Sequence, residues 1–520
     1  MIFNLLFTGL FLALSAVYIK NSLHMFQQNR YELYRYTNWL FNRRNLHFSP
    51  AIIYCALMIA LTIFLKGFAY DGAVFVLSAL MAVVALYLES KKTYIKKLVV
   101  TARVARQIAF MLVLMFFALI ISVEYLKVGI VGIIAIYLPY LMIYLMAVLT
   151  HPMETMIKKH YENEGRAILD AMDNLIKIGI TGSFGKTTTK NLVTDMISDS
   201  FYTLMTPASY NTPMGITRTI REHMKPIHEV FVCEMGADHV GEITYLMDYV
   251  KPKYGIVTSI GPQHLQTFHT MANIIKEKMA MIEKLPADGV GIINIDNEYI
   301  RDYKIRNSCK IKTIGIENKD ADYVAENIKY SKEGSSFTVT IDDCSYQFKT
   351  ALLGEHNIMN LLAAIALAKE LGVDNDKIVR NVAKAKRVEH RLELKKINGI
   401  TFIDNAFNSN PVGCKLSLDV LAMMDGKRVI VTPGLIDLGP KENDCNYEFG
   451  AYMKDRADFA VLVGEKQTAY ILKGLKDSGF DLDHILTVSS VKEAFAFIYG
   501  TFSSNDTILL ENDLPDAFSN

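Results

Sequence analysis

The chain of 520 residues has almost no net charge, because 55 lysines and arginines face 54 aspartates and glutamates. It therefore has no basic surplus that would point to nucleic acid or to a polyacidic partner. The sequence is also poor in cysteine, and its six cysteines form neither a C-x-x-C pair nor a His-linked zinc spacing. We expect them to be reduced, mostly buried thiols of a cytosolic domain, without a disulfide or metal role.

The apolar run from Ile2 to Ile19 lacks the basic leader and the small-residue cleavage site of a signal peptide, so we expect a retained helix. It is the first of about five apolar runs, each long enough to cross a bilayer core of ~30 Å as a helix. The runs cover residues 2–19, 51–66, 72–88, 107–125 and 129–149. None carries a central ionisable side chain, which argues against a pathway for protons or ions.

Two of the connections between these runs are basic, the one after the first run and the one spanning residues 89–106. By the positive-inside rule both are cytoplasmic, so the N-terminus lies outside and everything after residue 150 lies inside. We expect a multi-pass protein of the cell membrane. The basic side chains orient the helices, with binding of anionic membrane lipid as the alternative.

A glycine turn follows the predicted strand 176–181 and opens a helix that ends near residue 199. The backbone N–H groups of such a turn cradle phosphate oxygens. Lys186 would reach the β- and γ-phosphates of ATP, and the hydroxyl of Thr187 would bind Mg²⁺. The usual spacing requires glycine at position 180, where this chain has Ile180. Kinases and transport ATPases share the loop, so it indicates ATP binding and leaves the reaction open.

Two further side chains lie where parallel strands end. Glu234 closes the strand 229–234, and a carboxylate at the carboxyl edge of a parallel sheet can hold Mg²⁺. His264 follows the strand 254–260 and lies at the same predicted edge. From Asn174 onward, short apolar runs alternate with helical periods, which is typical of βαβ units.

The loop reads T-G-S-F-G-K-T-T, and the chain continues with A-D-H-V-G-E-I from Ala237, G-E-H-N from Gly354 and D-N-A-F-N-S-N-P from Asp404. Together these motifs resemble the Mur ligases, most closely the type that adds D-alanyl-D-alanine (MurF). The resemblance covers about residues 176–520. It departs from the family at Asn405, where the signature has a second acid. The apolar runs stand where MurF-type enzymes have a soluble domain that grips the UDP-sugar.

The apolar runs and the resemblance together imply a multi-domain chain. We expect a transmembrane helical domain over 1–150 and a linker over 151–175. An α/β ATP-binding domain of the Mur central type would follow over 176–386, and an α/β Rossmann-like domain over 387–520.

The resemblance also implies ATP and Mg²⁺ as cofactors and gives roles to named residues. The predicted metal ligands and catalytic groups are Thr187, Glu234, His264 and a carbamylated Lys278, with Lys276 as the competing lysine, and Lys186 completes the catalytic set. The predicted nucleotide contacts are Gly182, Ser183, Gly185, Lys186, Thr187, Thr188, Asn357 on the adenine side, Arg391 on the phosphates and Asp404 on the ribose. Ser209, Asn211 and Asn408 lie where the family contacts the substrate, although Ser209 and Asn211 also fit a plain turn.

The implied reaction is an ATP-dependent ligation through an acyl phosphate. A carboxylate acceptor takes the γ-phosphate, and the amine of an amino acid or dipeptide then displaces phosphate to form an amide. We expect a membrane-anchored ligase of cell-wall peptidoglycan or a related envelope precursor, acting on a lipid-linked acceptor. Two alternatives remain open: a ligase of a poly-γ-glutamate-like polymer, and a non-catalytic membrane scaffold that binds nucleotide.

Overall fold

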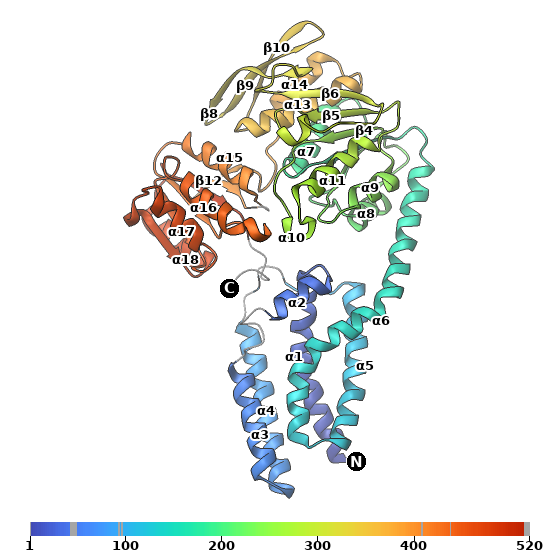
Figure 1. Ribbon diagram of the computed structural model, residues 1–520, viewed down its shortest axis with the longest axis vertical. Helices are drawn as coiled ribbons and strands as arrows, with labels where there is room; N and C mark the ends of the chain where they lie inside the picture. Colours follow the sequence, from blue (N-terminus) through green and yellow to red (C-terminus); the bar gives the residue numbers. More distant parts are fainter. Residues whose placement is uncertain are drawn as a thin grey trace. The chain divides into compact units, whose positions relative to one another are not determined.

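The computed structural model describes residues 2–41, 49–91, 94, 97–406, 409–436 and 438–513, and it divides into two compact units (Figure 1). The first unit runs to Lys159, and the second covers His160–Asp513. The first is helical, and the second combines two α/β domains. The predicted fold class is confirmed.

Helices make up the regular structure of the first unit. Their bounds are α1 Ile2–Gln28, α2 Leu33–Phe41, α3 Ser49–Phe64, α4 Gly67–Lys91, α5 Ala102–Tyr125 and α6 Val128–Asp170. Each predicted apolar run lies within one of these helices apart from a residue or two at its ends. Four of the described helices, α1, α4, α5 and α6, are long and apolar enough to cross a membrane, by length and composition. The apolar helix α3 has 16 residues. Helix α2 was not predicted, because its nine residues bury only one face, through Tyr36 and Leu40.

Helix α6 occupies most of the predicted linker over 151–175, because it continues to Asp170. The residues after the apolar run are mostly strong helix formers, so the helix does not end where the apolar run ends. Its last turns pack onto helix α9 (Glu242–Val250) within the second unit: the Tyr245 hydroxyl donates to Glu162 Oε2 at 2.6 Å. A side chain at Gly165 would place its Cβ 2.2 Å from the Tyr249 hydroxyl, so this contact requires glycine.

A seven-stranded parallel sheet, in the order β2-β3-β1-β4-β5-β6-β7, forms the centre of the next domain. The strands are β1 Ile176–Thr181, β2 Thr203–Met205, β3 Val230–Glu234, β4 Tyr254–Val257, β5 Val290–Asn294, β6 Lys310–Gly315 and β7 Tyr323–Val324. The helices are α7 Lys186–Ile197, α8 Pro213–His223, α10 Leu265–Phe268, α11 Met271–Glu283, α12 Glu298–Arg301, α13 Glu355–Glu370 and α14 Asn375–Lys384.

Helices cover both faces of this sheet (Figure 1). Buried side chains of α7 and α13 form one core with Ile178 and Ile180 of β1. Buried side chains of α8, α9 and α11 form the other core with Phe231 of β3. The parallel strands are therefore buried on both sides, as their continuous apolar sequences require. A separate antiparallel sheet is formed by β8 Glu326–Ser331, β9 Gly334–Ile341 and β10 Cys344–Thr350.

The C-terminal domain has a six-stranded sheet in the order β11-β12-β16-β13-β14-β15. Its strands are β11 Glu393–Ile397, β12 Ile400–Asn405, β13 Arg428–Thr432, β14 Phe459–Val463, β15 Ile485–Val488 and β16 Thr507–Glu511. Its helices are α15 Pro411–Ala422, α16 Glu442–Tyr452, α17 Ala469–Asp477 and α18 Val491–Thr501, with short 3₁₀ turns at Gly439–Lys441 and Leu482–His484. Strand β11 is antiparallel to β12, and the other described pairs are parallel. Strand β16 lies between β12 and β13, so residues distant in sequence meet at the carboxyl edge of this sheet.

Candidate active site

The glycine turn connects β1 to α7 and is fixed from behind by the segment after β4. The Ser183 hydroxyl donates to the Gly261 carbonyl at 3.0 Å, and the Phe184 N–H donates to the Ser259 hydroxyl at 3.2 Å. Gly182 has φ 151° and Gly185 has φ 82°. A Cβ at Gly182 would come within 2.1 Å of the Thr258 hydroxyl, so the turn requires glycine there.

Ile180 stands at the motif position that is usually glycine, and here this position belongs to strand β1 and not to the turn. It is buried in β1, and its carbonyl accepts a hydrogen bond from the Met235 N–H at 2.8 Å. The turn therefore begins only at Gly182, and it is shorter than the usual spacing implies. Thr187 and Thr188 follow in the first turn of α7, where free backbone N–H groups favour an anion.

The ammonium group of Lys186 points back at the turn. It donates to the carbonyls of Gly182 at 2.8 Å and Ser183 at 3.2 Å. Burial lowers the pKa of Lys186 to about 8, Glu234 opposes this shift and Arg391 adds to it. Lys186 therefore lies within the electrostatic reach of a central-domain carboxylate and a C-terminal arginine. A polyphosphate bound in the turn would supply the negative charge that this lysine lacks.

Glu234 ends β3 beside the turn, and its side chain is 1% exposed. Its Oε1 accepts a hydrogen bond from Asn211 Nδ2 at 2.9 Å. Its Oε2 is buried and accepts no hydrogen bond from a described residue, although Lys190 Nζ lies 3.5 Å away. A buried carboxylate oxygen without a hydrogen bond is costly unless a cation or donor completes its shell. Magnesium prefers such oxygen donors, so Glu234 fits the predicted metal.

Lys190 is a site residue that the sequence analysis missed. It lies one helical turn after Lys186 on α7, is fully buried, and donates to the Ala208 carbonyl at 2.5 Å as well as pairing with Glu234. Burial lowers its pKa, and Glu234 opposes that shift. A lysine four residues after Lys186 on a helix that packs against a sheet was the available signal.

The structure separates the two competing lysines of α11. Lys276 is exposed, whereas Lys278 is 1% exposed and donates to the Ala237 carbonyl at 3.1 Å. Burial and the charge of Lys186 lower the pKa of Lys278 to about 7. Lys278 is therefore near the glycine turn. At physiological pH a large share of its amino groups is neutral. The geometry favours Lys278 over Lys276.

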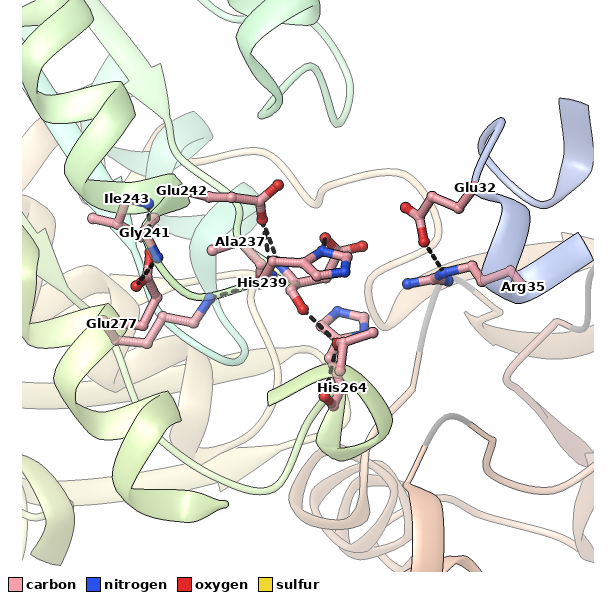
Figure 2. A network of polar contacts seen from close by, with 12 residues as sticks. Glu32, Arg35, Ala237, His239, Gly241, Glu242, Ile243, His264 and Glu277 are labelled. Carbon is pink, nitrogen blue, oxygen red and sulfur yellow. Dashed lines mark hydrogen bonds and ion pairs between the residues drawn. The ribbon is translucent and has the colours of Figure 1, made fainter. Parts of the chain in front are cut away.

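The neighbouring side chain, Glu277, fixes the loop that Lys278 contacts. Its carboxylate accepts hydrogen bonds from the N–H groups of Gly241 at 2.7 Å and Ile243 at 2.6 Å (Figure 2). His264 immediately precedes the short helix α10 and has a left-handed backbone conformation, with φ 52°. The Thr267 hydroxyl of α10 donates to the Asp238 carbonyl, which places the His264 loop beside this same segment.

The predicted adenine-side and substrate-side residues are ordered by local contacts. Asn357 is buried at the start of α13 and donates to the Leu353 carbonyl at 2.8 Å. Ser209 and Asn211 form a tight turn in which the Asn211 N–H donates to the Ser209 carbonyl at 2.8 Å. This turn is joined to the phosphate site, because Asn211 and Lys190 both reach Glu234. Asn408 lies outside the described residues.

In the C-terminal domain, Arg391 is coupled electrostatically to Glu234 and Glu511, which both oppose the lowering of its pKa by burial. Asp404 is buried, and its carboxylate already accepts from Lys395 Nζ at 2.7 Å and contacts His390 Nδ1 at 2.7 Å. Its contact with a ribose stays a prediction. His390, Glu393 and Asp404 are close enough to hold a metal, but the Lys395 ammonium lies 2.7 Å and 3.0 Å from the two carboxylates and takes the cation's place.

Comparison with known proteins agrees with this architecture. Residues 180–368 match the Mur ligase middle domain, and residues 390–511 match the Mur ligase, glutamate ligase domain. The chain belongs to the Mur ligase family. It is 30% identical over 338 residues to the UDP-N-acetylmuramoyl-tripeptide–D-alanyl-D-alanine ligase of Bacillus subtilis (strain 168), covering 64% of this chain and 72% of the relative.

Two further comparisons point to the MurF type. The ligase of the same name from Escherichia coli (strain K12) is 30% identical over 293 residues, which cover 56% of this chain and 65% of that protein. The chain thus spans just under two thirds of the length of that relative. A crystal structure of MurF from Acinetobacter baumannii has a TM-score of 0.62 at 25% identity, covering 68% of this chain and 77% of that chain.

Proposed function

We propose that this protein is an ATP-dependent, amide-bond-forming ligase of the MurF type, anchored in the membrane by its N-terminal helices. The observation that carries the proposal is that Lys186, which donates to two carbonyls of the glycine turn, is coupled electrostatically to Glu234, Lys278 and Arg391. Each of these side chains is charged or can carry charge, and together they suit a polyphosphate better than an uncharged ligand.

The chemistry divides into two steps. A carboxylate oxygen of the acceptor forms a bond to the γ-phosphorus of ATP while the bond to the β-γ bridging oxygen breaks, and ADP leaves. The donor amine then attacks the acyl carbon, phosphate leaves, and the amine loses a proton to water. Lys186 and Arg391 would offset charge on the phosphates, and the glycine turn would align them.

Magnesium, when bound, would neutralise phosphate oxygens during this transfer. Thr187, Glu234, His264 and Lys278 are the residues that would hold it. Lys278 would take part as a carbamate: its neutral Nζ attacks carbon dioxide, forms an N–C bond and releases a proton. A pKa near 7 supplies the neutral amine that this reaction requires.

The first unit supports membrane anchoring by its surface. Large apolar side chains on α3, α4 and α5 are strongly exposed, among them Phe64 at 81%, Phe68 at 84% and Phe117 at 57%. A water-soluble domain rarely leaves so much apolar surface uncovered. With the topology expected from the basic loops, the ligase domains lie in the cytoplasm, and a lipid-linked carboxylate acceptor would be delivered at the membrane.

One experiment tests the ligase and its acceptor. Purified full-length protein in lipid nanodiscs is incubated with ATP, D-alanyl-D-alanine or single amino acids, and either a soluble UDP-muramyl peptide or its lipid-linked form. Mass spectrometry should find an amide product and ADP, with faster turnover of the lipid-linked acceptor. Equal turnover of both would contradict the lipid-linked acceptor, and glutamate chains as products would support the polymer ligase.

A variant separates an enzyme from a nucleotide-binding scaffold. Lys186→Ala removes the cation that contacts the phosphates, and we expect product formation to fall by at least about 100-fold. Full ligation by this variant would refute the proposed role of the glycine turn. ADP release that no acceptor stimulates, in the wild type, would support the scaffold.

A further inference from the structure

The end of β16 holds a carboxylate that the predicted site does not include. Glu511 is fully buried at the carboxyl edge of the C-terminal sheet. In the parallel pairing of β12 with β16, it lies directly beside Asn405. Asn405 is the position at which this chain departs from the acidic signature that it otherwise resembles.

Three side chains donate hydrogen bonds to Glu511. Its Oε2 accepts from Asn405 Nδ2 at 2.9 Å and from the Ser417 hydroxyl at 2.6 Å, and its Oε1 accepts from the Ser409 hydroxyl. Burial raises the pKa of Glu511, while these three bonds and the charge of Arg391 oppose the rise. A buried carboxyl with three donors and a nearby guanidinium group is suited to carry a charge.

The next residue, Asn512, connects the same strand end to two other segments. Its Oδ1 accepts from the Ser409 N–H at 3.1 Å, and its Nδ2 donates to the Gly434 carbonyl at 2.6 Å. Its φ of 69° lies in the left-handed region, which asparagine tolerates. Through Asn512, the end of β16 is therefore hydrogen-bonded both to the segment before α15 and to the segment after β13.

Arg391 relates this cluster to the phosphate site. Its guanidinium group is attracted by Glu234 of the central domain and by Glu511 of the C-terminal domain. Loss of Glu511 would remove one of these two attractions from a partly buried cation. Glu511 therefore contributes, together with Glu234, to the electrostatic environment of Arg391.

We propose that Glu511 is a positioning residue, which supplies from β16 the negative charge that the family signature carries at position 405. It holds Ser409 by a hydrogen bond and attracts Arg391, and both would thereby be kept in the arrangement that receives the nucleotide. Asn405 then has the complementary role, because its amide donates to Glu511 and an acid there would place two carboxylates about 3 Å apart. The expected changes in KM and kcat rest on the proposed function. The expected change in ADP affinity concerns nucleotide binding alone.

An isosteric exchange tests the pair. Glu511→Gln should raise the KM for ATP and the Kd for ADP by at least about tenfold, with a smaller fall in kcat, because an amide replaces the charge. Asn405→Asp should weaken ADP binding similarly. The double variant, with the acid at 405 and the amide at 511, should recover ADP affinity to within about threefold of wild type. A double variant no better than Glu511→Gln, with an unchanged Tm, would overturn the proposal.

Two more variants distinguish a specific loss of ADP binding from a general loss of folding. Glu511→Asp keeps the negative charge but shortens the side chain by one methylene. It should weaken ADP binding several-fold while the Tm stays near that of the wild type. Unchanged affinity for ADP would overturn the proposal. Glu448→Gln removes an exposed partner of Lys415 in the same domain and should change nothing. Since ADP affinity is measured on the full chain without an acceptor, the result does not depend on ligation. If the wild type forms no amide, the proposed function fails while this inference is still tested.

Discussion

Lys190 and Glu234 form an ion pair at 3.5 Å in which the two side chains are 0% and 1% exposed. The pair joins the first helix of the phosphate site to the end of β3. Lys190 also donates to Ala208, beside the predicted substrate turn, so one ammonium group connects the residues predicted to contact nucleotide with those predicted to contact the acceptor.

Lys190→Met should therefore destabilise the protein and impair ligation together. Removing one partner of a buried pair leaves an uncompensated charge, which costs about 3–5 kcal/mol. We expect that loss in urea unfolding and a fall of at least about tenfold in kcat/KM. Lys284→Met is the matched control, because its bond to Asp248 at 2.8 Å is exposed and contributes at most about 1 kcal/mol. Equal stability of the two variants would contradict the role of Lys190.

Substitution of the two lysines of α11 should affect ligation differently. Lys278→Ala should reduce ligation by at least about 100-fold, because it removes the predicted carbamate ligand. Lys276→Ala should keep nearly full activity, since that side chain is exposed. Nuclear magnetic resonance with isotopically labelled bicarbonate should show a carbamate signal in the wild type that is absent from Lys278→Ala. A signal that persists in Lys278→Ala and disappears in Lys276→Ala would reverse the assignment.

His356 should make stability depend on pH. Its Nδ1 is buried without a hydrogen-bond partner among the described residues, and burial lowers the pKa of His356 from 6.5 to about 4. The unfolded chain therefore takes up a proton at higher pH than the folded chain, so the free energy of unfolding falls as pH drops from about 6.5 to about 4. We expect His356→Gln to remove about 1–3 kcal/mol of this dependence.

Urea unfolding near pH 7 and near pH 5 measures this effect. The exposed His223→Gln variant should follow the wild type at both values. If the pH dependence of His356→Gln equalled that of the wild type, the buried ring would not be its source.

Membrane topology can be checked by cysteine labelling in intact cells. In a chain with Cys55→Ser, Cys344→Ser and Cys445→Ser, which removes the accessible thiols, Lys127→Cys lies in the short connection between α5 and α6, which we expect outside. Ser90→Cys lies near the end of α4, which we expect inside. An impermeant maleimide should label the first and not the second until the cells are opened. The reverse pattern would place the catalytic domains outside.

Sequence reasoning was most successful for features that depend on residues adjacent in the chain. The strand 176–181, the helix that follows the glycine turn and the strand that ends at Glu234 are local signatures, and each formed as expected. Lys190 could not be recognised in this way, because its importance arises from a carboxylate more than 40 positions later in the chain. Glu511 is a stronger example, since Asn405 and Glu511 become neighbours only when β16 pairs with β12.

The linker shows a different limit. The apolar pattern that marked the last membrane run ends near residue 149, but the helical hydrogen bonds of α6 do not depend on apolarity and continue to Asp170. Polar residues with high helix propensity extended the helix until its last turns packed against α9. The sequence alone does not show this packing, because it depends on Tyr245 and Tyr249 of another helix.

The place of β16 in the C-terminal sheet affects how that domain is made. It is synthesised after the other strands, yet it pairs with both β12 and β13. Until it emerges from the ribosome, the growing polypeptide holds two partial sheets with exposed strand edges, which invite aggregation or chaperone capture. Since β16 also carries Glu511, the hydrogen bonds of Asn405, Ser409 and Ser417 to this carboxylate cannot form during translation before the strand is inserted.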